Sequence, residues 1–335
     1  MKEFTITQET SGQRLNKVLQ KLLPGAGTSF LYKMLRKKNI TVNDQKADGA
    51  RILRSGDTIR IWFSDETYRK FSAENQAPDA ADTSAELSVQ PDVLYEDDDL
   101  LFINKPAGLL IQPDGKHTDC LTAQVGRYLM QEDKTDRSGI FRAGPANRLD
   151  YNTSGITAFG KTIRGQQYLA EQFRERSIKK YYLALAYGDI PCRADAEKIL
   201  TGWYVKDHRE NTARLYTGTL RPASAIEVRL GVTPLTRNNE SVLLRVHLLT
   251  GKSHQIRAQL AADGHPLAGD PKYGDRRWNG KLARQYDLKR QFLHAYQLAL
   301  RDINGKPLHV VAPIPGDLAR VLKGEKLWEP GIPEA

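Results

Sequence analysis

A short polar loop at residues 147–155, which reads Asn-Arg-Leu-Asp-Tyr-Asn-Thr-Ser-Gly, holds residue types that are suited to chemistry. It places one carboxylate, Asp150, close to the guanidinium of Arg148, and it leads into the apolar run 156–160, which predicts a buried strand. A carboxylate on a loop held by a rigid scaffold is a candidate nucleophile. Composition alone also fits a plain turn, because Asp, Asn, Ser and Gly dominate turns. The choice between the two depends on what the rest of the chain brings to Asp150.

Arg257, far along the chain, is a second residue whose local setting could place it at a site. Arg257 follows a predicted strand that ends at Gly251, and it lies in the first turn of a helix that Ser253 is predicted to cap. An arginine beside an aspartate lowers the pKa of the carboxyl group by roughly 1–3 units and so keeps it ionised. Taken alone, an arginine at such a position is more often a surface residue.

The loop 147–155 closely resembles the signature loop of RluA-type pseudouridine synthases, His/Asn-Arg-Leu-Asp-x-x-Thr-Ser-Gly, whose Asp is catalytic. Other motifs of that family are matched at separated places: the Asn-Lys-Pro-x-Gly turn at 104–108, Lys-x-Tyr-x-Ala at 180–184, Thr-Gly-Lys-Ser-His-Gln-Ile-Arg at 250–257, and segments 264–274 and 292–295. The resemblance implies that Asp150 is the catalytic residue, that Tyr182 is the active-site tyrosine and that Arg257 pairs with Asp150. It covers about residues 92–315 for the catalytic part.

The resemblance further implies that the chain converts uridine in RNA to pseudouridine. This isomerisation breaks the N1–C1′ bond, rotates the uracil and joins C5 to C1′, without a cofactor or a metal. Asp150 would attack either C1′ of the ribose or C6 of the base, and Tyr182 would pack against the target base and serve as general base on a ribose proton. The uridine must leave its stack at a cost of a few kcal/mol, and Arg148 is the candidate to enter the vacated space or to hold a phosphate.

The bulk properties agree with an RNA partner. The chain has 335 residues, a formal net charge of +10 and a pI near 9.4, and a positive charge of this size attracts polyanions. Its length predicts two domains. The two cysteines, Cys120 and Cys192, are too few for a disulfide framework or a zinc site and are expected to be buried thiols. No signal-peptide pattern or membrane-spanning run is present, so we expect a soluble, cytoplasmic protein, with a monomer as the default.

Residues 1–63 predict a small RNA-binding domain. Two helices are expected, one at 14–23 and one that runs to residue 38 and is capped by Thr28 and Ser29. Strands are expected at 1–7, 40–43 and 58–62. The region holds twelve Lys and Arg against five Asp and Glu, a net charge of +7. The cations expected to contact RNA phosphates cluster on and just after the second helix: Lys33, Arg36, Lys37 and Lys38. The pattern resembles the S4-like module shared by a ribosomal protein and tyrosyl-tRNA synthetase.

Residues 64–91 predict a flexible linker, because they are polar, rich in alanine and nearly free of large apolar groups. Residues 92–335 predict the catalytic domain, an α+β fold with a largely antiparallel mixed sheet and a central cleft. Its first strands form a hairpin at 93–95 and 100–104, and strands are also expected at 180–188, 212–216, 223–230, 241–249, 291–300 and 307–312. Helices are expected at 119–130, from Thr162 to residue 176, and at 253–262.

Competing interpretations are weaker. A serine hydrolase built on Ser154 would need Gly at the position of Asn152. A metal hydrolase would have to use His247, His254, His265 and Asp270, whose irregular spacing matches no metal motif. The target is expected to be large-subunit ribosomal RNA, as for enzymes of the RluC/RluD kind. A tRNA target and a non-catalytic ribosome-assembly factor on the same fold are the alternatives. Asn147 and Lys252, where the family more often has His and Arg, leave the subfamily open.

Overall fold

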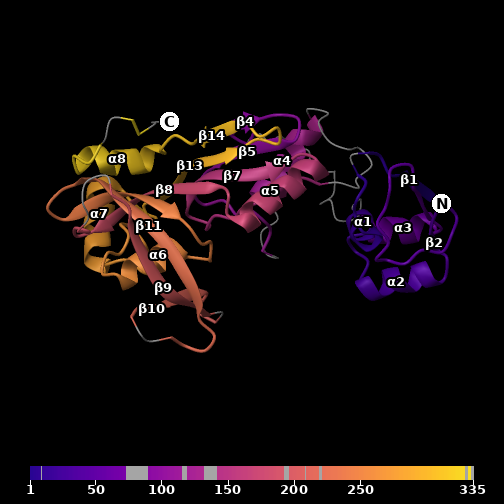
Figure 1. Ribbon diagram of the computed structural model, residues 1–335, viewed down its shortest axis with the longest axis horizontal. Coiled ribbons are helices and arrows are strands. Elements are labelled where there is room, and N and C mark those ends of the chain that lie inside the picture. The colour runs from indigo at the N-terminus through magenta and orange to yellow at the C-terminus, as the bar shows by residue number, and fades with distance from the viewer. Residues whose placement is uncertain are drawn as a thin grey trace.

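The computed structural model describes residues 1–8, 10–72, 90–114, 119–131, 142–191, 196–207, 209–218, 221–328 and 331–332 (Figure 1). The described elements form two groups, a small N-terminal module and a larger unit built on one sheet. No helix within these ranges is long and apolar enough to cross a membrane. Cys120 is a buried free thiol, as expected, whereas Cys192 lies outside the described residues.

The N-terminal module packs helices against a three-stranded antiparallel sheet in the order β1-β3-β2. Its elements are β1 (Lys2–Thr5), α1 (Leu15–Leu22), α2 (Thr28–Arg36), β2 (Ile40–Val42), β3 (Thr58–Ile61) and α3 (Asp65–Phe71). The predicted helices and strands are present, and β1 is an edge strand, as its alternating pattern indicated. Side chains from all of these elements except β1, such as Leu19, Leu35 and Ile59, are buried in one core.

Two boundaries of α2 differ from the sequence expectation. The N-cap residue is Gly27, without a side-chain cap, so the prediction that Thr28 and Ser29 cap this helix was wrong. The helix ends at Arg36 rather than at Lys38. Lys38 adopts a left-handed conformation with φ of 60°, and the N–H of Asn39 donates to the carbonyl of Met34, which closes the helix end.

Helix α3 occupies the first part of the range 64–91, for which a linker was expected. Ser64 caps it by accepting a hydrogen bond from the N–H of Thr67. Tyr68 is buried in the core of the N-terminal module and Phe71 packs against that core. Their spacing of three residues places both rings on one side of the helix, which explains why this segment folds onto the module. Residues 73–89 lie outside the described part of the chain.

The larger unit is built on a sheet of eleven strands, in the order β10-β9-β11-β12-β8-β13-β7-β5-β4, with β14 paired to β13 and β6 paired to β7. The strands are β4 (Val93–Glu96), β5 (Leu100–Lys105), β6 (Gly144–Pro145), β7 (Ser154–Gly160), β8 (Lys179–Tyr187), β9 (Lys198–Asp207), β10 (Thr212–Tyr216), β11 (Ile226–Arg237), β12 (Ser241–Leu248), β13 (Leu293–Arg301) and β14 (Pro307–Val311). All pairings are antiparallel except β13 with β7, so the predicted mixed, largely antiparallel sheet is confirmed.

The helices of this unit cover different parts of the sheet. They are α4 (Leu121–Gln131), α5 (Ile163–Glu175), α6 (Gln255–Ala262), α7 (Arg276–Tyr286) and α8 (Gly316–Gly324). On strand β8, Tyr182 and Ala184 face a core shared with α6, whereas Leu183 and Leu185 face a core shared with α7 and α8. We refer to the side that Tyr182 joins as the cleft face and to the side that Leu183 joins as the reverse face.

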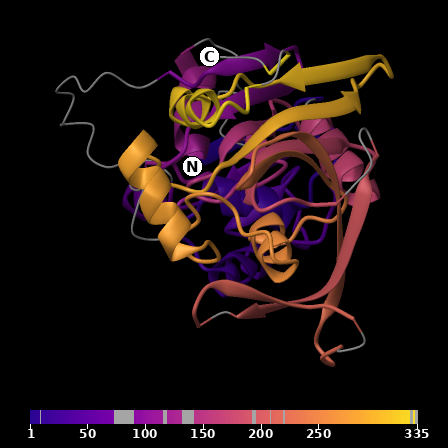
Figure 2. The ribbon, with the colours of Figure 1, turned by 90° about the vertical axis from the view of Figure 1, so that its left-hand side faces the viewer.

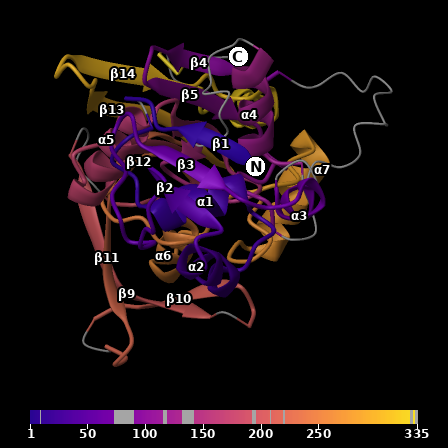
Figure 3. The ribbon, with the colours of Figure 1, turned by 90° about the vertical axis from the view of Figure 1, so that its right-hand side faces the viewer.

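Four elements of this unit were not predicted from the sequence: β6, β9, α7 and α8. In β9 the residue Gly202 interrupts the apolar pattern, and in α7 only Trp278 and Leu282 are buried. The strand expected at 223–230 begins at Ile226 and runs on to Arg237. Strands β9 and β10 form a hairpin that extends beyond the rest of the sheet, at the bottom of Figures 2 and 3.

Candidate active site

A cleft of about 850 Å³ brings together the three residues that the sequence singled out. Asp150 comes from the loop before β7, Tyr182 from β8, and Arg257 from the first turn of α6. Strands β7 and β8 both pair with β13, and α6 packs on the same face as Tyr182. Segments that are separated by more than a hundred residues therefore line one cavity. Arg148 also lines it and is exposed.

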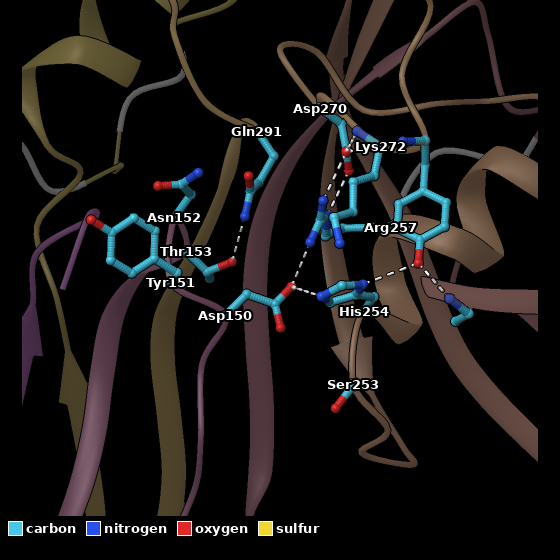
Figure 4. Close-up of polar contacts among 12 residues, drawn as sticks. Asp150, Tyr151, Asn152, Thr153, Ser253, His254, Arg257, Asp270, Lys272 and Gln291 are labelled. Atoms are coloured by element: carbon cyan, nitrogen blue, oxygen red, sulfur yellow. Dashed lines mark hydrogen bonds and ion pairs between the residues drawn. The ribbon is translucent and has the colours of Figure 1, made fainter. Parts of the chain in front are cut away.

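Arg257 connects two carboxylates (Figure 4). Its Nη1 donates a hydrogen bond to Oδ2 of Asp150 at 2.9 Å, and its Nε and Nη2 donate to the two oxygens of Asp270 at 2.6 and 2.8 Å. The Asp270 side chain is fully buried, while that of Asp150 is 22% exposed. Asp270 thus fixes the guanidinium, and Asp150 Oδ1, to which no described residue donates a hydrogen bond, is left for a substrate.

The charges of this group support one another. Burial alone would lower the pKa of the Arg257 guanidinium, but the hydrogen bonds and charge of Asp270, with the charge of Asp150, raise it above its ordinary value. Burial would raise the pKa of Asp270, but Arg257 and the N–H groups of Lys272 and Tyr273 lower it below its ordinary value. The cation and the supporting anion therefore both stay charged at neutral pH.

Comparison with known proteins identifies the family. A model described as RNA pseudouridylate synthase matches residues 99–262. The ribosomal large subunit pseudouridine synthase D of Nitrosomonas europaea is 32% identical over 324 residues, which covers 96% of this chain and 87% of that protein. This chain belongs to the RNA pseudouridylate synthase family.

Further comparisons agree with this assignment. The ribosomal large subunit pseudouridine synthase C of Vibrio cholerae is 29% identical over 321 residues, 95% of this chain and 94% of that protein. The structure of human RNA pseudouridylate synthase domain containing 4 matches with a TM-score of 0.57 at 22% identity, over 72% of this chain and 95% of that one. The structural likeness shows that the fold is that of a pseudouridine synthase.

The loop that carries Asp150 in this pseudouridine synthase is fixed by a close strand pairing. The N–H of Thr153 donates to the carbonyl of Asp150, and β7 begins at the next residue. Gly155 has φ of 114°, and a Cβ atom there would lie 2.2 Å from the carbonyl oxygen of Ala295 on β13. Only glycine fits both the conformation and the space, so the Gly of the signature loop sets the parallel contact of β7 and β13.

A buried lysine ties the same loop to the turn after β5. Lys105 Nζ donates to the carbonyl oxygens of Pro106, Leu109 and Tyr151 at 2.6, 2.9 and 3.1 Å. Its side chain is fully buried, and burial lowers its pKa to about 7. Since an ammonium group has three donors, Lys105 satisfies all of them with backbone oxygens. The Asn-Lys-Pro-x-Gly turn is therefore hydrogen-bonded, through Lys105, to the loop that carries Asp150.

A second support comes from the segment before β13. Arg290 Nη1 donates to the carbonyl oxygen of Asn152 at 3.2 Å. Gln291 Nε2 donates to Oγ1 of Thr153, also at 3.2 Å (Figure 4). Arg290 also makes two hydrogen bonds, of 2.6 and 2.9 Å, to the carboxylate of Asp317 in α8. The loop is thus connected to the C-terminal helix through one guanidinium.

Tyr182 lies on the cleft face with only 7% of its surface exposed. Burial raises the pKa of its hydroxyl, and the negative charge of Asp150 adds to the effect. The phenol therefore stays protonated at neutral pH. A protonated, fixed ring is better suited to pack against a base than to accept a proton at that stage.

His254, which the sequence analysis weighed only as a metal ligand, lies beside Asp150. Its Nε2 is 4.0 Å from Asp150 Oδ2, and its Nδ1 is 3.0 Å from the hydroxyl of Tyr273 (Figure 4). That hydroxyl accepts the N–H of Ala213 at 2.6 Å, so its own proton is free to be donated to Nδ1. Burial lowers the pKa of His254 against the opposing effect of Asp150. A neutral ring with its proton on Nε2 then points a donor at the carboxylate.

We expect His254→Asn to lower kcat for pseudouridine formation by about tenfold to a hundredfold with little change in KM, because the carboxylate loses one positioning contact. Asparagine tolerates the left-handed backbone of His254, whose φ is 57°, so the fold should be kept. Single-turnover and steady-state rates with a uridine-containing RNA would measure the effect. Tyr273→Phe removes the hydrogen bond to the His254 imidazole but keeps the imidazole, so it should lower kcat by a smaller factor. Equal kcat in all three proteins would contradict this role.

His254 also corrects the predicted start of α6. It is the N-cap residue and makes no side-chain cap, so the prediction that Ser253 caps this helix was wrong. The turn is closed instead by Gln255, whose Oε1 accepts the N–H of Lys252 and the hydroxyl of Thr250. Among the described residues no group of three or more His, Cys, Asp or Glu is arranged to hold a metal ion. Asp270, considered for that purpose, is the partner of Arg257.

Ser154, the nucleophile of the hydrolase alternative, is hydrogen-bonded to a histidine but does not line the cleft. Its Oγ is 2.9 Å from Nδ1 of His294, whose Nε2 is 3.3 Å from the carbonyl oxygen of Ala312. Ser154 is 2% exposed and His294 is fully buried. Because Nε2 must donate to the carbonyl, Nδ1 accepts the serine proton. The pair is therefore a hydrogen-bonded link between β7 and β13.

This link predicts a pH dependence of stability. Burial lowers the pKa of His294 to about 4, against about 6.5 in the unfolded chain. Between these values the unfolded state binds more protons, so the contribution of neutral His294 is complete above pH 6.5 and is lost as the pH falls toward 4. We expect His294→Gln to flatten the fall of unfolding free energy over pH 4–6.5 by up to about 1.4 kcal/mol per pH unit. Urea unfolding over this range would measure it, and identical slopes would exclude it.

The mouth of the cleft is strongly basic. Besides Arg148, four cations line the cavity that were not predicted as site residues: Arg174, Arg176, Lys180 and Lys252. Glu227 is the one acidic residue of the described lining other than Asp150. Lys180 and Lys252 lie within recognised motifs, while Arg174 and Arg176 reach the cavity only because α5 ends there. The cleft can therefore attract a phosphate backbone.

Asn147 and Lys252, the two departures from the family pattern, lie in different surroundings. The side-chain amide of Asn147 donates to the carbonyl of Ile156 and accepts the N–H of Ala158, so it holds β7 by both ends of the amide. Lys252 is exposed at the cleft. In the N-terminal module Lys33, Arg36, Lys37 and Lys38 are all exposed on and just after α2.

Proposed function

We propose that this chain isomerises uridines in large-subunit ribosomal RNA. The single observation that carries the catalytic part is the carboxylate of Asp150, held by Arg257 in a cleft that Tyr182 also lines. The target follows from the relatives, because the proteins of Nitrosomonas europaea and Vibrio cholerae are both named as large-subunit enzymes. Such a substrate agrees with the basic cleft mouth and with a net charge of +10.

The geometry suggests how the reaction is divided among the residues. Arg257 and His254 both approach Oδ2 of Asp150, so Oδ1 is the oxygen that faces the substrate. Attack by Oδ1 on C1′ or on C6 of the uridine would consume the negative charge of Asp150. Burial and, after it, the charge of Asp150 raise the pKa of Tyr182, so loss of that charge on attack would lower this pKa and make the hydroxyl a better proton donor. Arg148, which is exposed at the cleft, would enter the space that the flipped uridine leaves in its stack or hold a phosphate.

The proposal has a direct test. Large-subunit ribosomal RNA transcribed with tritium at C5 of uridine should release tritium on incubation with the protein, because C5 loses its hydrogen when it bonds to C1′. Bulk tRNA labelled in the same way serves as the alternative substrate. Release from tRNA alone would move the target to tRNA, and release from neither would favour the non-catalytic assembly factor. All site residues come from one chain, so we propose that a monomer acts, in the cytoplasm where ribosomal RNA would be met.

We further propose that the N-terminal module is an S4-like RNA-binding domain that anchors the enzyme on RNA without reading bases. Four exposed cations on and after α2 support this role: Lys33, Arg36, Lys37 and Lys38. Phosphate contacts of this kind fix position but carry no sequence information. Because α3 packs onto the module, substitution of these cations is a cleaner test than removal of residues 1–63.

Changing Lys33, Arg36, Lys37 and Lys38 together to Gln should weaken RNA binding and reduce the slope of log K against log salt by about 2.8, at about 0.7 for each single-strand phosphate contact. Fluorescence anisotropy with a labelled ribosomal RNA fragment at several salt concentrations would measure the slope. The matched control replaces four exposed cations elsewhere in the module by Gln: Lys2, Lys17, Lys46 and Arg54. An equal loss in both proteins would contradict the assignment to α2.

A further inference from the structure

A second groove, of about 510 Å³, lies on the reverse face of the sheet. Tyr181 of β8 lines it, whereas the next residue, Tyr182, lines the active-site cleft. Successive side chains of a strand point to opposite faces, so the two hollows lie on either side of β8. Strands β12, β13 and β14 contribute Arg245, Arg301 and His309. We call this hollow the reverse groove.

The reverse groove is basic and partly aromatic. Lys179, Arg245, Arg301 and His309 are exposed, and none of the described residues that line the groove is acidic. Lys179 and Arg245 form no ion pair with any described residue, while Arg301 donates to the carbonyl oxygen of Gly305 within its own hairpin. Cations that are not neutralised by the protein itself are available to an external anion.

The aromatic part is Tyr181, which is half-buried. The Arg245 guanidinium lies 5.9 Å from the centre of its ring, and the imidazole of His247 packs on it with ring centres 4.8 Å apart. His247 in turn bonds to Glu197 at 3.1 Å. The ring is thus held in place from one side, and a fixed ring beside cations is a platform on which a base can stack.

The groove is joined to the active-site cleft by a short stretch of chain. Lys179 lines the groove and Lys180 lines the cleft. At the end of α5, Arg174 and Arg176 line the cleft while Ser177 lines the groove. A polyanion that leaves the cleft past Arg176 therefore meets further cations round the amino-terminal end of β8, which begins at Lys179, and none of the described residues that line the groove is acidic.

We propose that the reverse groove binds the phosphate backbone of an RNA segment that flanks the target uridine. This rests on the proposed function, because the occupant is a continuation of the substrate strand. The contacts to Lys179, Arg245 and Arg301 are to phosphates, so the groove lengthens the footprint on RNA without selecting a sequence. An acidic peptide is the rival occupant, and the continuous basic path from the cleft favours RNA.

The test uses the full chain with Lys179→Glu and Arg245→Glu combined, and two fluorescent RNAs. One is a short stem-loop with the target uridine in its loop; the other adds single-stranded flanks of about ten nucleotides on both sides. We expect the variant to bind the flanked RNA roughly tenfold more weakly at low salt, with the salt slope reduced by about 1.4 for two single-strand contacts. Binding of the short stem-loop should be unchanged. Both side chains are exposed, so thermal unfolding should match that of the unaltered protein.

The matched control combines Arg284→Glu and Arg320→Glu, exposed residues of α7 and α8 that give the same change in net charge. The inference is overturned if the control and the groove variant lose affinity equally, or if the unaltered protein binds both RNAs with the same affinity. Loss of binding to a fluorescent polyglutamate peptide, with RNA binding intact, would also overturn it in favour of an acidic protein partner. Binding is scored separately from tritium release, so a protein that binds but does not isomerise would reject the proposed function instead.

Discussion

Asp150→Asn should abolish tritium release from C5-labelled RNA, with a loss of rate on the order of 10⁴ or more, as expected when a nucleophile is removed. Asparagine has nearly the same shape as aspartate, and its amide oxygen can still accept the hydrogen bond that Arg257 Nη1 gives to Oδ2. It lacks the negative charge that makes the carboxylate a nucleophile. RNA affinity, measured by fluorescence anisotropy, should stay within about twofold, because the phosphate contacts that dominate affinity are untouched.

The control for this result lies in the same loop. Tyr151 is exposed, and its hydroxyl makes no hydrogen bond to the described residues. Tyr151→Phe should therefore retain activity within a small factor. If Asp150→Asn kept measurable turnover above that of a blank, the catalytic carboxylate would have to be another residue.

Arg257→Met should have the second large effect, on stability as well as on activity. Among the described residues it removes the only cation bonded to the fully buried carboxylate of Asp270. Breaking a buried pair by removing one partner costs about 3–5 kcal/mol, because the remaining charge is left without compensation. The free energy of unfolding from urea titration would show this loss. Tritium release should fall as well, since Asp150 loses its partner at 2.9 Å.

A double variant separates the two effects. In Arg257→Met with Asp270→Asn neither charge of the buried pair remains, and the amide oxygen of asparagine can still accept the N–H groups of Lys272 and Tyr273. Most of the lost stability should return, whereas activity should not, because Asp150 still lacks its guanidinium. A single variant as stable as the unaltered protein would show that the ion pair does not hold the site together. Recovery of activity in the double variant would show that Asp150 works without Arg257.

Local patterns in the sequence were sufficient for several elements. The Thr162 side chain caps α5 by accepting the N–H of Gly165, as its position before an apolar-periodic run indicated. The acidic segment between β4 and β5 forms the expected hairpin turn, in which Asp97 accepts the N–H groups of Asp99 and Leu100. These features depend on residues within a few positions of one another, so the sequence contains all the information they need.

Other elements depend on contacts that no local pattern reveals. Strand β9 contains Gly202 and is stabilised by pairing with β10 and β11 on either side. Helix α2 ends before Lys38 because Lys38 adopts a left-handed conformation, which lets the N–H of Asn39 donate to the carbonyl of Met34. In both cases tertiary or turn geometry overrides the propensity of the residues involved.

The candidate site shows the same division. Asp150, Tyr182 and Arg257 were expected from their motifs, and the structure brings them to one cleft. The supporting partners of the site are nonlocal: Asp270 holds the far side of the guanidinium, and His254 approaches the carboxylate through a turn whose geometry could not be read from the sequence. Motifs in the sequence identify the candidate catalytic residues, whereas the residues that orient them can be identified only from the folded structure.

The hydrogen bonds of Arg290 connect helix α8 to the loop that carries Asp150, so α8 can affect turnover. Helix α8 is the last helix of the described chain, and trimming of a terminus is often tolerated when the removed part is not tied down. Here Asp317 neutralises the guanidinium that donates to the carbonyl of Asn152, two residues from Asp150, the proposed nucleophile. Proteolysis or a premature stop codon that removed α8 would leave that guanidinium without its anion beneath the loop. Because Leu318 and Leu322 of α8 are also buried in the core of the reverse face, the same loss would weaken the packing of the sheet together with the loop that carries Asp150.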